Sequence, residues 1–141
     1  MWASADTINN LYYTCRVKGL ACIGKSTVLD GKYSEQEVVS LPNEENIEYM
    51  HPCVAHDGSY LIVDTQSNDT EKFYGLYISF NQKDDTWTKP ISMREFIPFK
   101  SAGMARLSSD GKYLFFQAEG DFYWISTKII EELKPKNIKY N

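Results

Sequence analysis

The chain has no long hydrophobic run and no excess of positive charge. No stretch approaches the ~20 consecutive apolar residues that a transmembrane helix needs. The first residues show no basic segment followed by an apolar run, so we expect no secretory signal. The net charge of −4 provides no positive surface of the kind that binds nucleic acid or anionic membranes. The sequence therefore predicts neither membrane insertion nor a nucleic-acid partner.

Cysteine and histidine are scarce, with three and two residues. Cys15 and Cys22 flank a short loop and could face each other across a hairpin, where two reduced, buried thiols are favoured over a disulfide. Cys53 lies in an apolar strand and is expected in the core. His51 and His56 lie at opposite ends of one strand, which argues against a shared metal or a catalytic dyad. With so few ligand types close together, we expect no metal and no cofactor.

Apolar and aromatic residues, in contrast, are plentiful. The 141 residues are 43% apolar, which is enough for one domain with a real core. Aromatic residues make up 14% of the chain, with ten Tyr and seven Phe. These side chains pack well on a pleated, half-buried surface, so the composition favours β-strands.

An internal repeat organises the sequence. The segment 51–63, which includes Asp57-Gly58-Ser59-Tyr60-Leu61, resembles 104–116, which includes Asp110-Gly111-Lys112-Tyr113-Leu114, and Asp57 and Asp110 lie 53 residues apart. A second element, Asp-Gly-Lys-Tyr-Ser at 30–34, matches Asp-Asp-Thr-Trp-Thr at 84–88 with an offset of 54 residues. Two independent elements with nearly the same period indicate a repeated structural unit.

Each repeat is predicted to form four short antiparallel strands, so the fold class is all-β. Asp57-Gly58 provides hairpin chemistry, because Gly supplies a positive φ. The run 60–63 is apolar throughout, as expected of a strand covered on both faces. Pro90 suits an edge strand, since proline cannot donate a hydrogen bond to a ladder. The predicted strands are 2–6, 10–15, 22–28 and 33–39 in the first unit, 50–55, 59–65, 74–80 and 86–92 in the second, and 103–108, 112–117 and 121–126 in the third. The segment 127–134 replaces the last strand with a short helix whose apolar face carries Ile129, Ile130 and Leu133.

These motifs resemble the WD-like, TolB-type β-propeller repeat family. The likeness lies in the turn segments 57–61 and 110–116, the strands Gly-Leu-Tyr-Ile-Ser at 75–79 and Asp-Phe-Tyr-Trp-Ile-Ser at 121–126, and Asp-Thr-Trp-Thr-Lys-Pro at 85–90. It implies a single propeller segment over 1–141, with blades at 1–41, 49–93 and 102–134, and a periplasmic or secreted location. Ala55-His56 departs from the Ser-Pro that usually precedes this turn in the family. Because propellers close with about four to eight blades, either a second copy or further blades are expected to complete the ring.

The connections differ in length at the two ends of the predicted strands. One end has the tight turns 30–31, 57–58, 84–85 and 110–111, and the other has the longer connections 16–21, 41–49, 66–73 and 94–102. Binding residues concentrate on longer loops held by a rigid scaffold, so a site is expected at the second end. The candidate binding residues there are His51, Tyr74, Arg106 and Gln117, with Arg16 and Lys100 nearby.

Each candidate also has an ordinary structural role open to it. His51 fits a satisfied turn or channel-lining position, and Tyr74 fits a packing aromatic. Arg106 fits an ion pair with Glu119 or Asp64. The Asp-rich turns lack ligands at alternate positions and are interpreted as turn formers rather than calcium sites.

No Ser/His/Asp or Cys/His constellation is visible in the sequence, so we expect a non-enzymatic protein. The leading hypothesis is a recognition scaffold that binds a protein, peptide or glycan through its long-loop face. The alternative is a propeller hydrolase or lyase, of the lactonase or glycan-active type, with its site in a central channel that further blades complete. A third reading is a purely structural segment of a larger ring.

Overall fold

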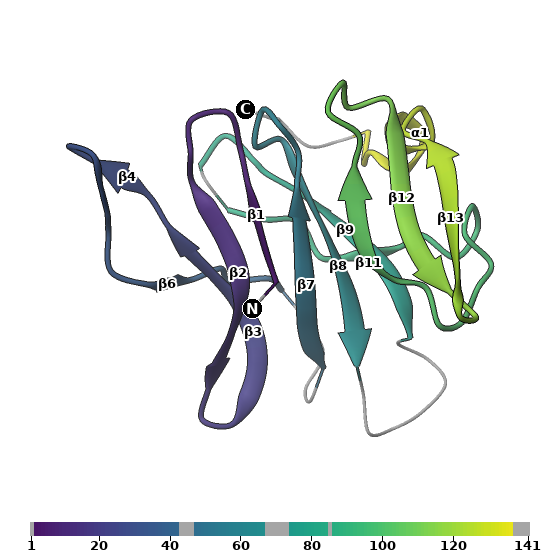
Figure 1. The fold of residues 1–141 in the computed structure, drawn as a ribbon, viewed down its shortest axis with the longest axis horizontal. Coiled ribbons are helices and arrows are strands. Elements are labelled where there is room, and N and C mark those ends of the chain that lie inside the picture. The colour runs from purple at the N-terminus through teal and green to yellow at the C-terminus, as the bar shows by residue number, and fades with distance from the viewer. Residues whose placement is uncertain (1, 43–46, 67–73, 85, 137–141) are drawn as a thin grey trace.

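The computed structural model describes residues 2–42, 47–66, 74–84 and 86–136 (Figure 1). Within these residues the chain forms three antiparallel sheets, one two-stranded hairpin and one short helix. The predicted all-β class and the short C-terminal helix are confirmed. Residues 43–46 and 67–73 of the predicted long connections, and Asp85 of the predicted turn, lie outside the described residues.

The first sheet contains β1 (Ala3–Ala5), β2 (Leu11–Val17), β3 (Leu20–Ser26) and β6 (Glu37–Val38), hydrogen-bonded in that order. The prediction of one strand at 33–39 is wrong, because β4 (Val28–Leu29) and β5 (Lys32–Tyr33) form a separate hairpin that projects from the sheet in Figure 1. Asp30 and Gly31 both have positive φ, 50° and 74°. Two such residues close a two-residue hairpin, so the chain folds back before it can pair with β3.

The second sheet contains β7 (Glu48–Val54), β8 (Tyr60–Gln66), β9 (Gly75–Phe80) and β10 (Ile91–Ser92), again paired in chain order. The predicted strand at 86–92 is shorter than expected. Among the described residues of this segment, β10 and an isolated bridge between Asn81 and Trp87 form the ladder pairings with β9 and its end. Pro90 lies between these two points and has no N–H to donate, which accounts for the interrupted ladder.

The third sheet contains β11 (Gly103–Leu107), β12 (Tyr113–Ala118) and β13 (Asp121–Ser126), and α1 (Ile129–Leu133) follows it. In the described residues no fourth strand joins this sheet, as the sequence predicts. Ile130 of α1 is buried in the core, and Ile129 and Leu133 pack against the same cluster. The predicted apolar face of the helix therefore packs on the core that the second and third sheets share.

The second sheet lies between the other two and supplies the centre of the core. Leu61, Ile62 and Val63 of β8 each have no exposed surface. Leu61 and Val63 belong to a cluster that includes Tyr12 of the first sheet. Ile62 belongs to a second cluster, which includes Leu114 of the third sheet. Alternate side chains of one strand thus face two neighbouring sheets, which explains the continuous apolar run.

Cys15 and Cys22 lie opposite each other on β2 and β3, as the sequence suggested. Their Sγ atoms are 3.0 Å apart, and both residues are free thiols. Burial, together with the neighbouring Cys22, raises the pKa of the Cys15 thiol to about 12. Burial also raises the pKa of Cys53, which is a core residue as predicted, to about 11. The thiols of Cys15 and Cys53 are therefore protonated and weakly nucleophilic at neutral pH.

Three aspartates hold the tight turns through their carboxylates. Asp57 accepts hydrogen bonds from Ser59, at 3.0 Å from the backbone N–H and 2.6 Å from the hydroxyl. Asp84 accepts the same pair from Thr86, and Asp110 accepts from the Ser108 hydroxyl and the Lys112 N–H. Burial alone would raise the pKa of Asp57, but its hydrogen bonds hold it below the ordinary 3.8. The hydrogen bonds from Thr86 and Ser108 likewise lower the pKa values of Asp84 and Asp110.

These lowered pKa values predict an acid-sensitive fold. A carboxylate with a depressed folded-state pKa stabilises the protein above its unfolded pKa, and that contribution is lost as the pH falls through the folded value. We expect the melting temperature to fall between about pH 5 and pH 2. Replacing Asp57, Asp84 and Asp110 together with Asn should make this fall smaller.

Thermal unfolding followed by circular dichroism at pH 7, 5, 3 and 2 measures the effect. The control is a triple variant in which the exposed residues Glu35, Glu95 and Glu119 become Gln, because it removes the same number of charges away from these turns. The turn explanation would be contradicted if the two triple variants lost the same number of degrees on acidification.

Candidate functional site

The first strands of the second and third sheets, β7 and β11, are interrupted at corresponding places. The register of β7 shifts between Met50 and Cys53, and that of β11 shifts between Gly103 and Arg106. Each of these β-bulges contains a non-glycine residue in the left-handed region, His51 with φ 47° and Met104 with φ 54°. The two residues lie 53 positions apart, which is the period of the sequence repeat. A strained backbone conformation that recurs with the period of the sequence repeat is part of the repeated structural unit and not a local irregularity.

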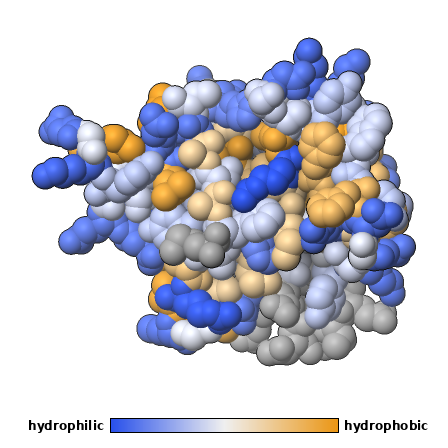
Figure 2. All heavy atoms as spheres, viewed as in Figure 1, coloured by the Kyte–Doolittle hydropathy of each residue, from blue (hydrophilic) through white to orange (hydrophobic). Residues whose placement is uncertain are grey.

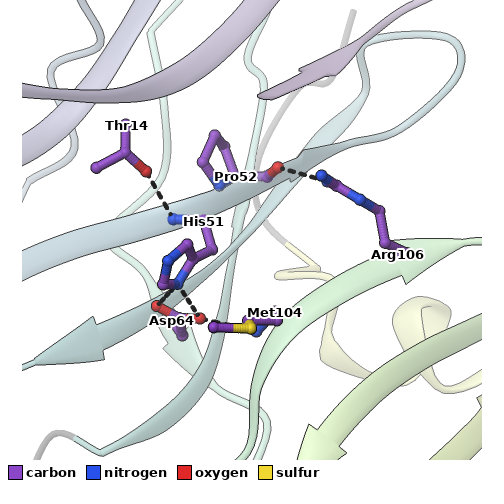
Figure 3. A network of polar contacts seen from close by, with 6 residues as sticks. All are labelled: Thr14, His51, Pro52, Asp64, Met104 and Arg106. Atoms are coloured by element: carbon purple, nitrogen blue, oxygen red, sulfur yellow. Dashed lines mark hydrogen bonds and ion pairs between the residues drawn. The ribbon is translucent and has the colours of Figure 1, made fainter. Parts of the chain in front are cut away.

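The N–H group at each bulge bonds a side chain of the preceding sheet (Figure 3). The His51 N–H donates to Oγ1 of Thr14 on β2 at 2.9 Å. The Met104 N–H donates to Oδ2 of Asp64 on β8 at 2.8 Å. We call this repeated hydrogen bond the bulge contact. It fixes the second sheet to the first and the third sheet to the second, and it satisfies an N–H that the bulge removes from the ladder.

Asp64 also holds the ring of His51. Nδ1 of His51 lies 2.9 and 2.8 Å from the two carboxylate oxygens of Asp64. The Asp64 side chain is 9% exposed and that of His51 is 25% exposed, so the pair is largely shielded from water. Burial raises the pKa of Asp64, while the Met104 N–H and His51 act in the opposite direction. One carboxylate therefore serves a bulge contact and the orientation of an imidazole.

Arg106 makes a different contact from the ion pair that the sequence suggested. Asp64 is occupied by His51, and the Arg106 guanidinium lies over the ring of Trp2, 4.0 Å from its centroid. It also donates to the carbonyl oxygen of Pro52 at 3.4 Å (Figure 3). Trp2 meets the His51 ring edge-on at 5.4 Å between centroids. Arg106 thus contributes to packing between the first and third sheets.

A groove of about 460 Å³ lies beside the His51–Asp64 pair. It brings together three of the four predicted binding residues, since His51, Tyr74 and Gln117 all line it. Arg106 does not line the groove. Tyr74 is 38% exposed, so it is not a fully packed aromatic. Arg16 and Lys100 do not line the groove. The Arg16 guanidinium instead donates a hydrogen bond to the carbonyl oxygen of Gly19 in the β2–β3 turn.

The opposite end of the strands also has a hollow, of about 420 Å³, between the tight turns and α1. Asp57 and Ser59 in its lining bond each other within their turn, and Ile130 fills the core beneath. The groove at His51 differs because strands from the second and third sheets converge on the His51–Asp64 pair, of which Asp64 is buried. We therefore take it as the candidate site.

Sequence reasoning missed Asp64, Met104 and Trp2 as parts of this site. A signal for Asp64 was present, because a carboxylate at the end of the apolar run Leu61-Ile62-Val63 must find a partner when it is buried. The positive φ of Met104 and the long-range contact of Trp2 have no local signature in the sequence.

Glycine at position 103 makes the bulge contact possible. A Cβ atom there would lie 2.8 Å from Oδ2 of Asp64, closer than real Cβ contacts. Gly103→Ala should therefore displace the carboxylate and lower the free energy of unfolding by about 1–3 kcal/mol. Urea denaturation measures this loss.

A double-mutant cycle identifies the cause. In an Asp64→Ala background the obstructing oxygen is gone, so Gly103→Ala should cost less than half of what it costs in the wild type. Additive losses would mean that Gly103 is needed for some other reason.

No family model, curated protein or solved structure matches the chain. No group of three or more His, Cys, Asp or Glu side chains suited to a metal ion is found among the described residues. In the same residues no helix is long and apolar enough to cross a membrane.

Proposed function

We propose that the chain is a segment of a β-propeller and acts as a non-enzymatic recognition scaffold, binding a protein, peptide or glycan in the groove beside His51. Three features support the propeller. Each sheet is a meander paired in chain order, β7 and β11 carry the same bulge, and the middle sheet is covered on both faces. Radially packed four-stranded sheets have these properties.

The observation that carries the binding proposal is the convergence of His51, Tyr74 and Gln117 on one groove. They come from three separate segments, so only the folded chain places them together. The Tyr74 ring offers a flat apolar face with a polar tip, and the Gln117 amide both donates and accepts hydrogen bonds. A few polar groups on an otherwise apolar concave surface are typical of ligand sites.

The bulge contacts support a preformed site. His51 is held by Thr14 through its backbone and by Asp64 through its ring. Met104, also in the groove lining, is held through its N–H by the same carboxylate. A site whose groups are fixed before binding loses less conformational entropy when the ligand arrives.

The proposal is tested by screening the purified chain against an immobilised glycan array and a random-peptide display library, followed by calorimetry with the tightest ligand. Tyr74→Ala and Gln117→Ala should each weaken binding by about tenfold or more. Tyr33→Ala is the matched control, because Tyr33 is 56% exposed on the β4–β5 hairpin, away from the groove. Ligands that bind all three variants with wild-type affinity would overturn the proposal.

The His51–Asp64 pair favours a second candidate function, a hydrolase or lyase. A carboxylate that accepts from Nδ1–H leaves Nε2 as the proton acceptor, an arrangement suited to a general base. A panel of aldonolactones and uronate oligosaccharides, with and without added Ca²⁺, tests this function. Turnover that disappears in His51→Gln and persists in Tyr33→Ala would replace the non-enzymatic proposal.

A further inference from the structure

The outer face of the third sheet is an exposed aromatic surface. The side chains of β12 alternate between exposed and buried, with Tyr113 and Phe115 exposed by 41% and 43%. On β13, Phe122 and Trp124 are exposed by 73% and 63%. Phe115 lies opposite Trp124 in the ladder. The rings of Tyr113 and Trp124 meet edge-on, with 5.2 Å between their centroids. Figure 2 shows hydrophobic side chains gathered over β12. We call these four residues the aromatic face.

The repeat indicates which kind of structure covers such a face. Tyr113 and Phe115 occupy the positions of Tyr60 and Ile62, 53 residues earlier. Ile62 is completely buried, in the cluster that the second sheet forms with the third. The face of the second sheet that corresponds to the aromatic face is therefore covered by the next sheet.

The first sheet exposes the opposite kind of face. Thr14 and Asp64 correspond, since each accepts a bulge contact, so Tyr13 corresponds to Val63. Val63 is fully buried in the cluster shared with the first sheet. Tyr13 is only half-buried, and Val38, which shares its face across Gly24, is 50% exposed. We call the side of the first sheet that carries Tyr13 and Val38 the receiving face.

We propose that a second copy of the chain covers both surfaces, with the aromatic face of each copy packed on the receiving face of the other. The same packing already joins the second and third sheets within one chain. There the side of the second sheet that carries Ile62 packs on the side of the third sheet that carries Leu114. One chain carries one face of each type, so the contact is head-to-tail and closes when two copies make it reciprocally. The resulting six sheets fall within the range of about four to eight that closes a ring.

The four exposed aromatic side chains indicate that this face is covered by a protein partner and not by solvent. Contiguous apolar patches on a soluble protein mark interaction surfaces or cause aggregation. The reciprocal arrangement buries both surfaces at once. This inference rests on the propeller part of the proposed function. Gln117 of the groove lies on the same side of β12 as Phe115 and opposite Phe122, so the contact between copies would border the groove, although a single copy supplies all of the groove's lining residues.

Sedimentation velocity at about 1–100 µM, the range in which a specific dimer of this kind should form, tests the inference. The wild type should sediment as a dimer of the 16.3 kDa chain. Trp124→Arg and Val38→Arg should each shift the population to monomer, because each places a charge in both reciprocal contacts. Tyr33→Arg, on the hairpin, should remain dimeric. Circular dichroism spectra matching the wild type show that the variants are folded.

Mixing the two monomeric variants separates this arrangement from others. A pair of Trp124→Arg and Val38→Arg copies has one contact with both substitutions and one contact with neither, so dimers should reappear on mixing. A face-to-face dimer of two aromatic faces would be disrupted by Trp124→Arg but not by Val38→Arg, and that result overturns the proposal. A monomeric wild type at about 100 µM also overturns it and leaves the two faces to further sheets of a longer chain. Groove binding by such a monomer would leave the recognition function standing.

Discussion

Replacing Asp64 by alanine should lower the free energy of unfolding by about 3 kcal/mol. The carboxylate accepts hydrogen bonds from the Met104 N–H and from His51, and it is largely buried. Without it, a donor in the bulge and an imidazole lose their partner away from water, and hydrogen bonds to a charged group contribute about 1.5–3 kcal/mol each. Urea denaturation followed by tryptophan fluorescence measures the change.

Two further variants show whether the bulge contact is the cause. Asp64→Asn keeps one acceptor oxygen and should cost about 1 kcal/mol. Thr14→Ala removes only the acceptor of the His51 N–H and should also cost about 1 kcal/mol. If Asp64→Ala were no more destabilising than Thr14→Ala, the claim that Asp64 joins the second and third sheets would be wrong.

Replacing Ile62 by alanine should lower the free energy of unfolding strongly. Its side chain has no exposed surface and lies where the second and third sheets meet. A buried isoleucine cut back to alanine loses its transfer free energy and leaves a cavity, for a total of about 2–5 kcal/mol. Because the flanking sheets are linked by the bulge contacts, the cavity should not collapse easily, so we expect about 4 kcal/mol.

Ile8 provides a matched control of the same residue type. It is 73% exposed in the β1–β2 connection, so Ile8→Ala should change the free energy of unfolding by less than about 0.5 kcal/mol. Both variants are measured by urea denaturation under the same conditions. Similar losses in the two variants would contradict the placement of β8 between two sheets.

The parts of the fold that depend on neighbours in the sequence were predictable. Asp57-Gly58 and Asp110-Gly111 predict hairpins because Gly supplies the positive φ that the turn needs. The run Leu61-Ile62-Val63 predicts a strand covered on both faces, since the side chains on both faces of the strand are apolar, and all three are fully buried. The Asp30-Gly31 turn was also visible, but it closes a short separate hairpin instead of extending the first sheet.

The site was predictable only in part. The difference in connection length placed His51, Tyr74 and Gln117 at one end of the strands, and these residues do line one groove. The pairing of His51 with Asp64 was missed because a bulge rotates His51 out of the regular alternation of its strand. The contact of Arg106 with Trp2 joins opposite ends of the chain and has no local pattern.

The most direct test of the central claim, that the groove end of the molecule recognises the ligand, is a ¹H–¹⁵N NMR titration with the tightest ligand from the glycan and peptide screens. The backbone amide signals of Gly75, Gly103 and Gln117, in the groove lining, should shift as ligand is added. The amides of Gly58 and Gly111, in the tight turns at the other end, should stay in place. Shifts confined to Gly58 and Gly111, with the groove amides unchanged, would contradict the central claim.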